Sequence, residues 1–352
     1  MRKRMLFIGS LPTKKVHFNG ETNKTGDIFR IFKRRTNYRI TKINLTHFKL
    51  FNTAKMILCS MLFKYDTIFI SKCIVGGALS AHLILNFGRK ANKDKISIYW
   101  IGNGTNGLEN KKIYLKDLEK CKCVIFESDQ IYEEFKYLRI KDYLICECVK
   151  PDYDLSPLVK DYESKTQLKC IYFSRICEQK GLMDAIKAIE IANKKLGGII
   201  FTLDIAGAPT SDEAIVFEQE MLSYIKDKNE FTYYGKSFCV SGIETYQRLQ
   251  QYDLHLFPSH FKQECVPGSI IDMFIAGVPT LSSSFPNSGN LLSNNDSYLF
   301  EQCNLNDFVN KLVYIYKNKQ ELNDKRIASN KLKDKYSEDA FFSNMLKHDI
   351  IS

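Results

Sequence analysis

Residues 253–284 read DLHLFPSHFKQECVPGSIIDMFIAGVPTLSSS, and the order of residue types predicts a strand, a loop, a helix and a second strand. Both expected strands are short apolar runs bounded by turn-forming residues. An apolar run that begins after Pro267 and stops at Gly277 predicts the helix. A strand–helix–strand unit of this kind is typical of a parallel sheet with helices on its faces.

The rest of the chain repeats this alternation, which predicts the α/β class with two doubly wound, Rossmann-like parallel sheets. The expected strands are 5–9, 66–71, 95–102, 123–128, 142–149, 168–175, 201–207, 231–235, 253–259, 278–284 and 297–300. The expected helices cover about 20–37, 75–90, 111–120, 129–139, 180–196, 211–227, 241–251, 268–276, 304–317, 319–334 and 338–350.

The chain of 352 residues is too long for one small core and comfortable for two. A charged stretch with two prolines separates two strand–helix blocks of similar size. We therefore expect an N-terminal domain at 1–150, a linker at 151–165 and a C-terminal domain at 166–330, with the two domains facing a cleft. The helical segment 331–352 is expected to pack back on the first domain.

Positive charge is concentrated at the start of the chain. Residues 1–50 contain 13 Lys and Arg against two acids, and the remaining residues balance. The segment IFRIFKRR (28–35) interleaves apolar and basic side chains, which suits a helix on anionic lipid headgroups. The alternative is a solvated helix with a buried apolar side. Nucleic acid is not an expected partner, because the aromatic residues here form no recognisable RNA- or DNA-binding module.

Eleven cysteines without the spacing of a disulfide scaffold predict reduced thiols and a cytoplasmic protein. The pairs Cys121/Cys123 and Cys146/Cys148 are expected to be buried apolar side chains rather than zinc ligands. Neither a secretory signal nor a membrane span is expected. The longest uncharged run, 73–88, is shorter than the ~20 apolar residues that a bilayer requires.

Two basic residues follow the first strand of the second half. The segment SRICEQKG (174–181) offers Arg175 at the carboxyl end of the strand and Lys180 near the start of the next helix. Ligands of doubly wound sheets bind beyond these strand ends. An Arg fork and a Lys ammonium that converge there suit a diphosphate.

A second group of candidates lies in the stretch quoted first. The main-chain amides of Val266, Gly268 and Ser269 stand at a helix start, which favours an anion. Glu264 is expected to accept hydrogen bonds from sugar hydroxyls. Asp272 lies about one helical turn further and would hold a ribose, or else it is a carboxylate favoured by the helix dipole.

These segments resemble the two signature segments of the retaining GT-B glycosyltransferases of family 4, bacterial enzymes that build capsular polysaccharide, O-antigen and related glycans. The Glu-x7-Glu motif of that family appears as Glu264-x7-Asp272, and its diphosphate-binding Arg and Lys match Arg175 and Lys180. Further similar segments come in the expected order: GETNKT (20–25), DIAG (204–207), YYG (233–235) and IAGVPT (275–280).

The resemblance also implies an acceptor side in the first domain. GETNKT is similar to the Gly-rich acceptor loop of the family, which implicates Gly20 and Glu21. Asn103 stands at a loop where family members often carry a His. Two departures concern the donor side: the second acid is Asp272, one methylene shorter than Glu, and Cys265 stands where many relatives have Gly.

The function implied by the resemblance is transfer of a hexose-type sugar from a UDP- or GDP-sugar to a glycan acceptor, lipid-linked, in the synthesis of lipopolysaccharide or capsule. Configuration would be retained and no metal or other cofactor required. Glu264, Arg175 and Lys180 would be the catalytic groups. The enzyme is expected to work in the cytoplasm, peripherally on the inner face of the plasma membrane.

Three alternatives stay open at this point. One is another GT-B enzyme, such as a nucleotide-sugar epimerase. Another is a degenerate member that binds nucleotide or lipid and supports a partner protein. The tripeptide DYD (152–154) matches the metal-binding Asp-x-Asp pattern of GT-A glycosyltransferases, but it falls in the expected linker.

Overall fold

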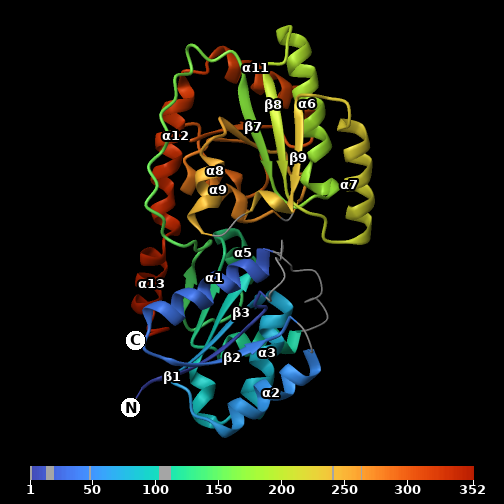
Figure 1. Cartoon of the computed structure of the whole chain (residues 1–352). Coiled ribbons are helices and arrows are strands. Elements are labelled where there is room, and N and C mark those ends of the chain that lie inside the picture. Colours follow the sequence, from blue (N-terminus) through green and yellow to red (C-terminus); the bar gives the residue numbers. More distant parts are fainter. Residues whose placement is uncertain (1, 13–19, 47–48, 103–111, 240–241, 263) are drawn as a thin grey trace. The chain divides into compact units, whose positions relative to one another are not determined.

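The computed structural model shows two compact units, each built around its own parallel sheet (Figure 1). Unit 1 comprises the chain up to Asp152 together with Tyr336–Ser352, and unit 2 comprises Tyr153–Lys335. The structure describes residues 2–12, 20–46, 49–102, 112–239, 242–262 and 264–352. The prediction of an α/β protein with two doubly wound sheets is confirmed.

The sheet of unit 1 has six parallel strands in the order β2-β1-β3-β4-β5-β6. Its central strands are nearly continuous apolar runs, because helices cover both faces of a parallel sheet. The order reverses between β1 and β3, so the loops after these two strands diverge and leave a ligand position. The strands are β1 (Arg4–Gly9), β2 (Arg39–Asn44), β3 (Thr67–Cys73), β4 (Ile96–Ile101), β5 (Cys123–Phe126) and β6 (Tyr143–Ile145).

Six α-helices of unit 1 lie within the described ranges, and the last of them comes from the end of the chain. Phe341 and Met345 of that helix, with Ile350 beyond it, are buried in the same core as Phe7 and Phe69 of the sheet. The helices are α1 (Gly20–Arg35), α2 (Lys49–Leu62), α3 (Ile74–Phe87), α4 (Lys112–Leu118), α5 (Asp129–Phe135) and α13 (Glu338–Lys347).

Helix α1 corrects one of the two expectations for segment 28–35. Ile28, Ile31 and Phe32 are buried in the core of unit 1, so this apolar side is not available to lipid. Two of its basic residues pair with acids of α13: Arg34 with Glu338 and Arg35 with Asp339. Figure 1 shows α13 in red beside the blue α1. The structure therefore favours the alternative of a helix with a buried apolar side over insertion of that side into lipid.

The sheet of unit 2 also has six parallel strands, in the order β9-β8-β7-β10-β11-β12. This is the dinucleotide-binding order 3-2-1-4-5-6, in which the reversal falls between the first and fourth strands. Here these are β7 and β10, the strands that precede the two groups of candidate residues. The strands are β7 (Leu168–Phe173), β8 (Phe201–Ala206), β9 (Phe231–Gly235), β10 (Leu254–Phe257), β11 (Thr280–Ser283) and β12 (Ser297–Phe300).

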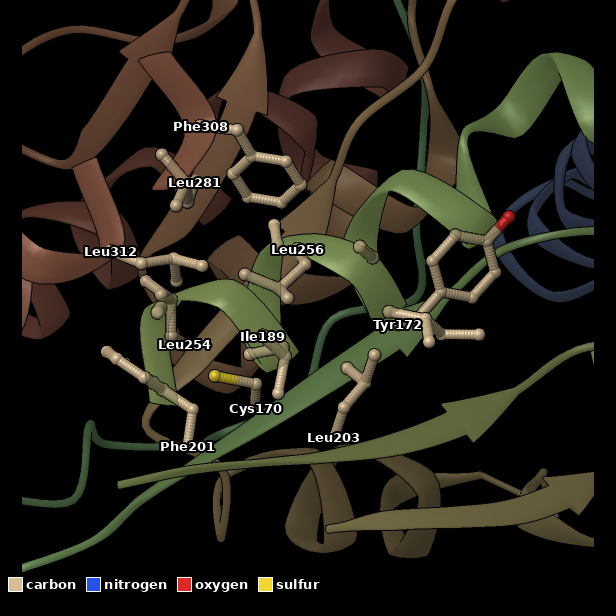
Figure 2. Packing of buried hydrophobic residues seen from close by; sticks show 14 of the residues in the cluster. Cys170, Tyr172, Ile189, Phe201, Leu203, Leu254, Leu256, Leu281, Phe308 and Leu312 are labelled. Carbon is tan, nitrogen blue, oxygen red and sulfur yellow. The ribbon is translucent and has the colours of Figure 1, made fainter. Parts of the chain in front are cut away.

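Two core clusters lie within the described residues of unit 2. One includes Leu249 of α8 and Met273 of α9, and the other packs helix α11 against the sheet. Figure 2 shows Leu203 of β8, Leu254 and Leu256 of β10 and Phe308 and Leu312 of α11 in one cluster. The helices of this unit are α6 (Leu182–Leu196), α7 (Asp212–Ile225), α8 (Ile243–Leu249), α9 (Gly268–Ala276), α10 (Ser288–Leu291), α11 (Leu305–Lys317) and α12 (Glu321–Lys331). Among the described residues of both units, no helix is long and apolar enough to cross a bilayer.

Residues 153–165, where a linker was expected, pack on unit 2. Tyr162 is buried in its core, and Lys160 and Lys165 donate to the carboxylate of Asp253, at 2.8 and 2.5 Å. Burial alone would raise the pKa of Asp253, but the two lysines outweigh it and hold that pKa below its usual value. Asp152, from the Asp-x-Asp tripeptide, accepts a hydrogen bond from the amide of Glu338 at 2.8 Å.

Candidate functional site

The loop after β7 lies against the end of β10 through a glycine contact. The chain leaves β7, forms a 3-10 turn at Glu178–Lys180 and enters α6. Gly181 joins the turn to the helix with φ of +69°, and a Cβ added there would lie 1.9 Å from the carbonyl oxygen of Pro258. Only glycine fits this position, and the close approach brings the two candidate loops together at the reversal of the sheet.

Lys180 and Glu264, whose sequence positions are 84 apart, are in direct contact. The Lys180 ammonium donates to Oε2 of Glu264, and the hydroxyl of Ser259 donates to the same oxygen at 2.9 Å. The side chains of the pair are 8% and 10% exposed, so little water screens their attraction. For the other carboxylate oxygen, Oε1, the described residues provide no hydrogen-bond partner.

Neighbouring residues hold the Glu264 loop in position. The carbonyl oxygen of Ser259 accepts hydrogen bonds from the Ser283 hydroxyl at 2.7 Å and from the Gln302 amide at 2.8 Å. His260 contacts Asp184 of α6 through Nε2 at 2.7 Å, and its main-chain amide donates to Gln179 at 2.9 Å. We did not predict these positioning residues, because none of them carries a motif and their partners are distant in sequence.

The start of α9 presents main-chain donors. The first amides of a helix have no acceptor within it, and Pro267, which precedes α9, has no N–H. Gly268 and Ser269 are partly exposed, so a ligand can reach them. Val266 is buried at 5% exposure. Of the three predicted amides, those of Gly268 and Ser269 are therefore the accessible donors.

Asp272 lies inside α9, one turn after Gly268. Its Oδ1 accepts a hydrogen bond from the Tyr246 hydroxyl at 3.0 Å. The Tyr246 ring packs on Tyr153 with a centroid distance of 4.9 Å. Asp272 is partly exposed, and the Tyr246 hydroxyl helps to orient its carboxylate.

Arg175 follows β7 and is exposed. The hydroxyl of Tyr172 donates to its carbonyl oxygen at 2.9 Å, which fixes the main chain at this point. Within the described part of the chain, no side-chain partner holds the guanidinium. It is thus a cation at the carboxyl end of the central strand that can turn towards an anion.

The predicted acceptor residues fall in unit 1. GETNKT forms the first turns of α1 rather than a loop, within the helix expected at about 20–37. The acceptor role of Gly20 and Glu21 stays a prediction. Glu21 accepts from the Lys72 ammonium at 3.1 Å, and Lys72 also donates to the Ser10 hydroxyl at 2.6 Å. These contacts join the end of β3 to the start of α1 and to Ser10, which directly follows β1, where the order of the sheet reverses. Asn103 lies outside the described residues.

A buried ion pair at the same edge of unit 1 was not predicted. Lys24 of α1 donates to Oε1 of Glu127 at 2.5 Å, and the amide of Gly102 donates to Oε2 at 2.7 Å. Burial raises the pKa of Glu127, while Lys24 and Gly102 oppose that rise. The signal in the sequence was a glutamate directly after the apolar strand β5.

One cluster of metal-ligand side chains occurs among the described residues: Cys123, Asp142 and His348 in unit 1. Burial raises the pKa of the Cys123 thiol, and the nearby Asp142 carboxylate adds to that rise. The thiol is therefore protonated at neutral pH. His348 contacts Asp142 at 2.9 Å, which fastens the end of the chain to the sheet. Cys123 begins β5 and Asp142 precedes β6, so the cluster lies at the amino ends of these strands. Glu127 and Lys72 lie at the carboxyl ends of β5 and β3, on the opposite edge of the sheet.

A hollow of about 490 Å³ borders the 3-10 turn of unit 2. Glu178, Glu213 and Glu220 line it, together with apolar residues of α7. Three carboxylates disfavour a diphosphate, so this hollow does not replace the Lys180–Glu264 site as a donor position.

No protein-family model and no curated protein matches the sequence. Solved structures do match. Anabaena HepE in complex with UDP and glucose is 12% identical with a TM-score of 0.70, over 98% of this chain and 99% of that one. Sucrose-phosphate synthase from Thermosynechococcus elongatus is 12% identical with a TM-score of 0.73, over 98% of both chains. TarM is 16% identical with a TM-score of 0.65 over 86% of this chain.

These three proteins are GT-B glycosyltransferases, and the chain has the GT-B fold. The chain spans 58% of the length of TarM. At identities this low, the similarity shows the fold alone.

Proposed function

We propose that the protein is a glycosyltransferase that moves a sugar from a nucleotide diphosphate to a glycan acceptor. The observation that carries the proposal is the shielded Lys180–Glu264 pair at the reversal between β7 and β10, close in sequence to the open amides of α9. Cations and main-chain donors at such a reversal suit a diphosphate, and a carboxylate with one unpaired oxygen suits sugar hydroxyls. HepE forms complexes with UDP and with UDP-glucose, which supports a nucleotide-sugar donor here.

In this proposal the chemistry depends on charge that develops as the sugar departs. Lys180, Arg175 and the amides of Gly268 and Ser269 stabilise the negative charge on the leaving diphosphate. Glu264 keeps Lys180 in place through Oε2 and accepts a sugar hydroxyl through Oε1. Asp272 holds the ribose. The resident cations make this stabilisation available without a metal ion.

The finer features of the proposal come from the resemblance to family 4. The transfer retains configuration, the donor is a UDP- or GDP-sugar carrying a hexose, and the acceptor is lipid-linked in surface polysaccharide synthesis. The reversal of the sheet of unit 1, where Glu21 of α1 and Lys72 of β3 meet, is the acceptor side. All eleven cysteines are free, which supports a cytoplasmic site of action.

The test combines donor binding with transfer. UDP- and GDP-sugars are titrated against the wild-type protein in thermal unfolding, where a bound donor raises the midpoint with concentration. The Glu264→Gln variant should bind donor and lower transfer by about 100-fold or more, because Lys180, which stabilises the developing charge, loses the anion that holds it in place. Lys180→Ala and Arg175→Ala should weaken donor binding. Glu220→Gln, in the acidic hollow, is the matched control and should leave both properties unchanged.

Two outcomes contradict the proposal. Release of an isomerised sugar nucleotide without any acceptor would identify an epimerase. Tight UDP binding with no turnover on any pool of lipid-linked glycans would identify a degenerate binding protein. The anomer formed, read by NMR, tests retention separately.

A further inference from the structure

Helix α2 exposes apolar side chains along its length. Met56 and Ser60 face the protein and are buried. The opposite side follows helical spacing, with positions 50, 54, 58 and 62 on one line. A surface helix normally turns its polar side to water, so this orientation is inverted. The large exposed side chains are Leu50 (91%), Phe51 (70%), Leu58 (54%), Met61 (50%) and Leu62 (58%), which we call the α2 face.

Further exposed aromatic residues continue beyond the end of the helix. Phe63 is 41% exposed, and Phe87, at the end of α3, is 57% exposed. The two helix ends are adjacent, because the amide of Arg89 donates to the carbonyl oxygen of Ser60 at 3.0 Å. The apolar surface therefore runs from α2 to the neighbouring end of α3. Figure 1 shows the two helices side by side.

Positive charge surrounds this surface. Residues 28–93 contain 13 Lys and Arg and a single acid, Asp66, and four of these cations (Arg30, Arg34, Arg35 and Lys72) pair with acids outside the range. Its carboxylate accepts a hydrogen bond from the main-chain amide of Arg4 at 2.8 Å. Lys55 lies within the α2 face, and Lys64, Arg89 and Lys90 are exposed beside it. An occupant of this surface must bury apolar groups and carry negative charge.

We propose that the α2 face binds the surface of an anionic phospholipid bilayer, with the apolar side chains among the acyl chains and the cations on the headgroups. An interfacial helix needs this combination of an apolar side and flanking Lys and Arg. A second copy of the chain fits less well, because it would place like charges against each other. The proposal is independent of the donor site, since vesicle binding needs no nucleotide sugar.

The experiment is sedimentation of the full chain with phosphatidylcholine vesicles, with and without phosphatidylglycerol, at low and high salt. We expect binding only to the anionic vesicles and weaker binding at high salt. The double variant Leu58→Glu/Met61→Glu should lower the partition coefficient by about 10-fold or more, because two apolar contacts are lost and two acids are added. Lys55→Gln/Lys64→Gln should lower it by about 5-fold per lysine.

Matched controls come from unit 2. Val159 and Ile199 are exposed apolar residues (72% and 48%), so Val159→Glu/Ile199→Glu adds the same charge elsewhere and should bind normally. Lys194→Gln/Lys195→Gln, at the exposed end of α6, is the control for the lysine variant. Circular dichroism and Trp100 fluorescence check the fold of every variant.

Three results would overturn the proposal. The first is absence of vesicle binding by the wild type. The second is equal binding by Leu58→Glu/Met61→Glu and its control. The third is a wild-type dimer in sedimentation equilibrium that this variant dissociates without any lipid, which would assign the α2 face to a second copy.

Discussion

His255 lies in the middle of β10 and is fully buried. Its Nδ1 contacts the Thr280 hydroxyl at 3.2 Å, and its Nε2 has no partner among the described residues. Burial lowers the pKa of His255 from 6.5 to about 3. The ring is therefore neutral in the folded protein, and the unfolded chain takes up a proton at a pH where the folded chain does not.

This difference predicts a pH-dependent stability. Because the folded pKa is below the unfolded pKa, the stabilisation is present above pH 6.5 and is lost as the pH falls towards 3. The contribution to the free energy of unfolding should fall by up to about 1.4 kcal/mol per pH unit in this window. Urea unfolding of wild type and His255→Leu between pH 7 and about 4 measures it. The variant should show a shallower dependence, and parallel curves would contradict the assignment.

The contact between Lys180 and Glu264 shows which part of the site could be predicted from the sequence and which part could not. Charged residues directly after apolar strands are visible in the sequence, so Arg175, Lys180 and Glu264 could all be selected. Their pairing could not be derived, because it depends on the reversal between β7 and β10 and on two loops 84 positions apart. Lys24 and Glu127 were missed for the same reason, since each charge taken singly looks solvated.

At the scale of elements, Gly181 links the 3-10 turn to α6 at a point where two strands end. Gly181→Ala should lower the free energy of unfolding by about 3 kcal/mol or more, because left-handed strain adds to a clash with the Pro258 carbonyl. Donor binding should weaken as well, since the turn that carries Lys180 must shift. Urea unfolding and the donor titration measure the two effects.

The control for this variant is Gly197→Ala at the end of α6. Gly197 also has a positive φ, of +80°, but a Cβ there meets nothing within 4 Å. It should lose only about 1–2 kcal/mol, and donor binding should stay at the wild-type level. Equal losses in the two variants would show that the Pro258 contact is unimportant.

Three elements, β2, α2 and the short α10, were not predicted. The strand β2 is at the edge of its sheet and buries little, so RITKIN has few of the apolar residues that mark a strand. Helix α2 has its apolar residues on the solvent side, so the usual relation between pattern and core does not apply to it. The strands at the centre of both sheets were predicted, because burial on two faces leaves continuous apolar runs in the sequence.

At the scale of the whole molecule, the chain ends in the unit where it began. Phe341 of α13 is buried against Phe32 of α1, with ring centroids 5.8 Å apart. Phe341→Ala should lower the stability of unit 1 by about 3–5 kcal/mol through lost burial and a cavity. The protein has a single tryptophan, Trp100 in β4, so its fluorescence reports the unfolding of unit 1 directly.

The neighbouring Phe342 supplies the control for this prediction. It is only partly buried and packs under the Arg35 guanidinium at 4.8 Å. Phe342→Ala should therefore cost about 1 kcal/mol, the scale of a partly exposed cation–π contact. A Trp100 transition that moves equally in both variants would contradict a special role of Phe341 in the core.

The sequence by itself determined the α/β class, the two parallel sheets and the residues that follow their strands, since these depend on local order and on burial that repeats along the chain. Only the tertiary structure decided which strands are neighbours, that Lys180 meets Glu264, and which side chains of α13 enter the core of unit 1. It also decided which helix buries its apolar side: α1 does, while α2 turns that side to solvent. The physical reason is that strand pairing and the buried side of a helix depend on contacts between segments distant in sequence. The residues of one segment do not determine which other segment packs against it.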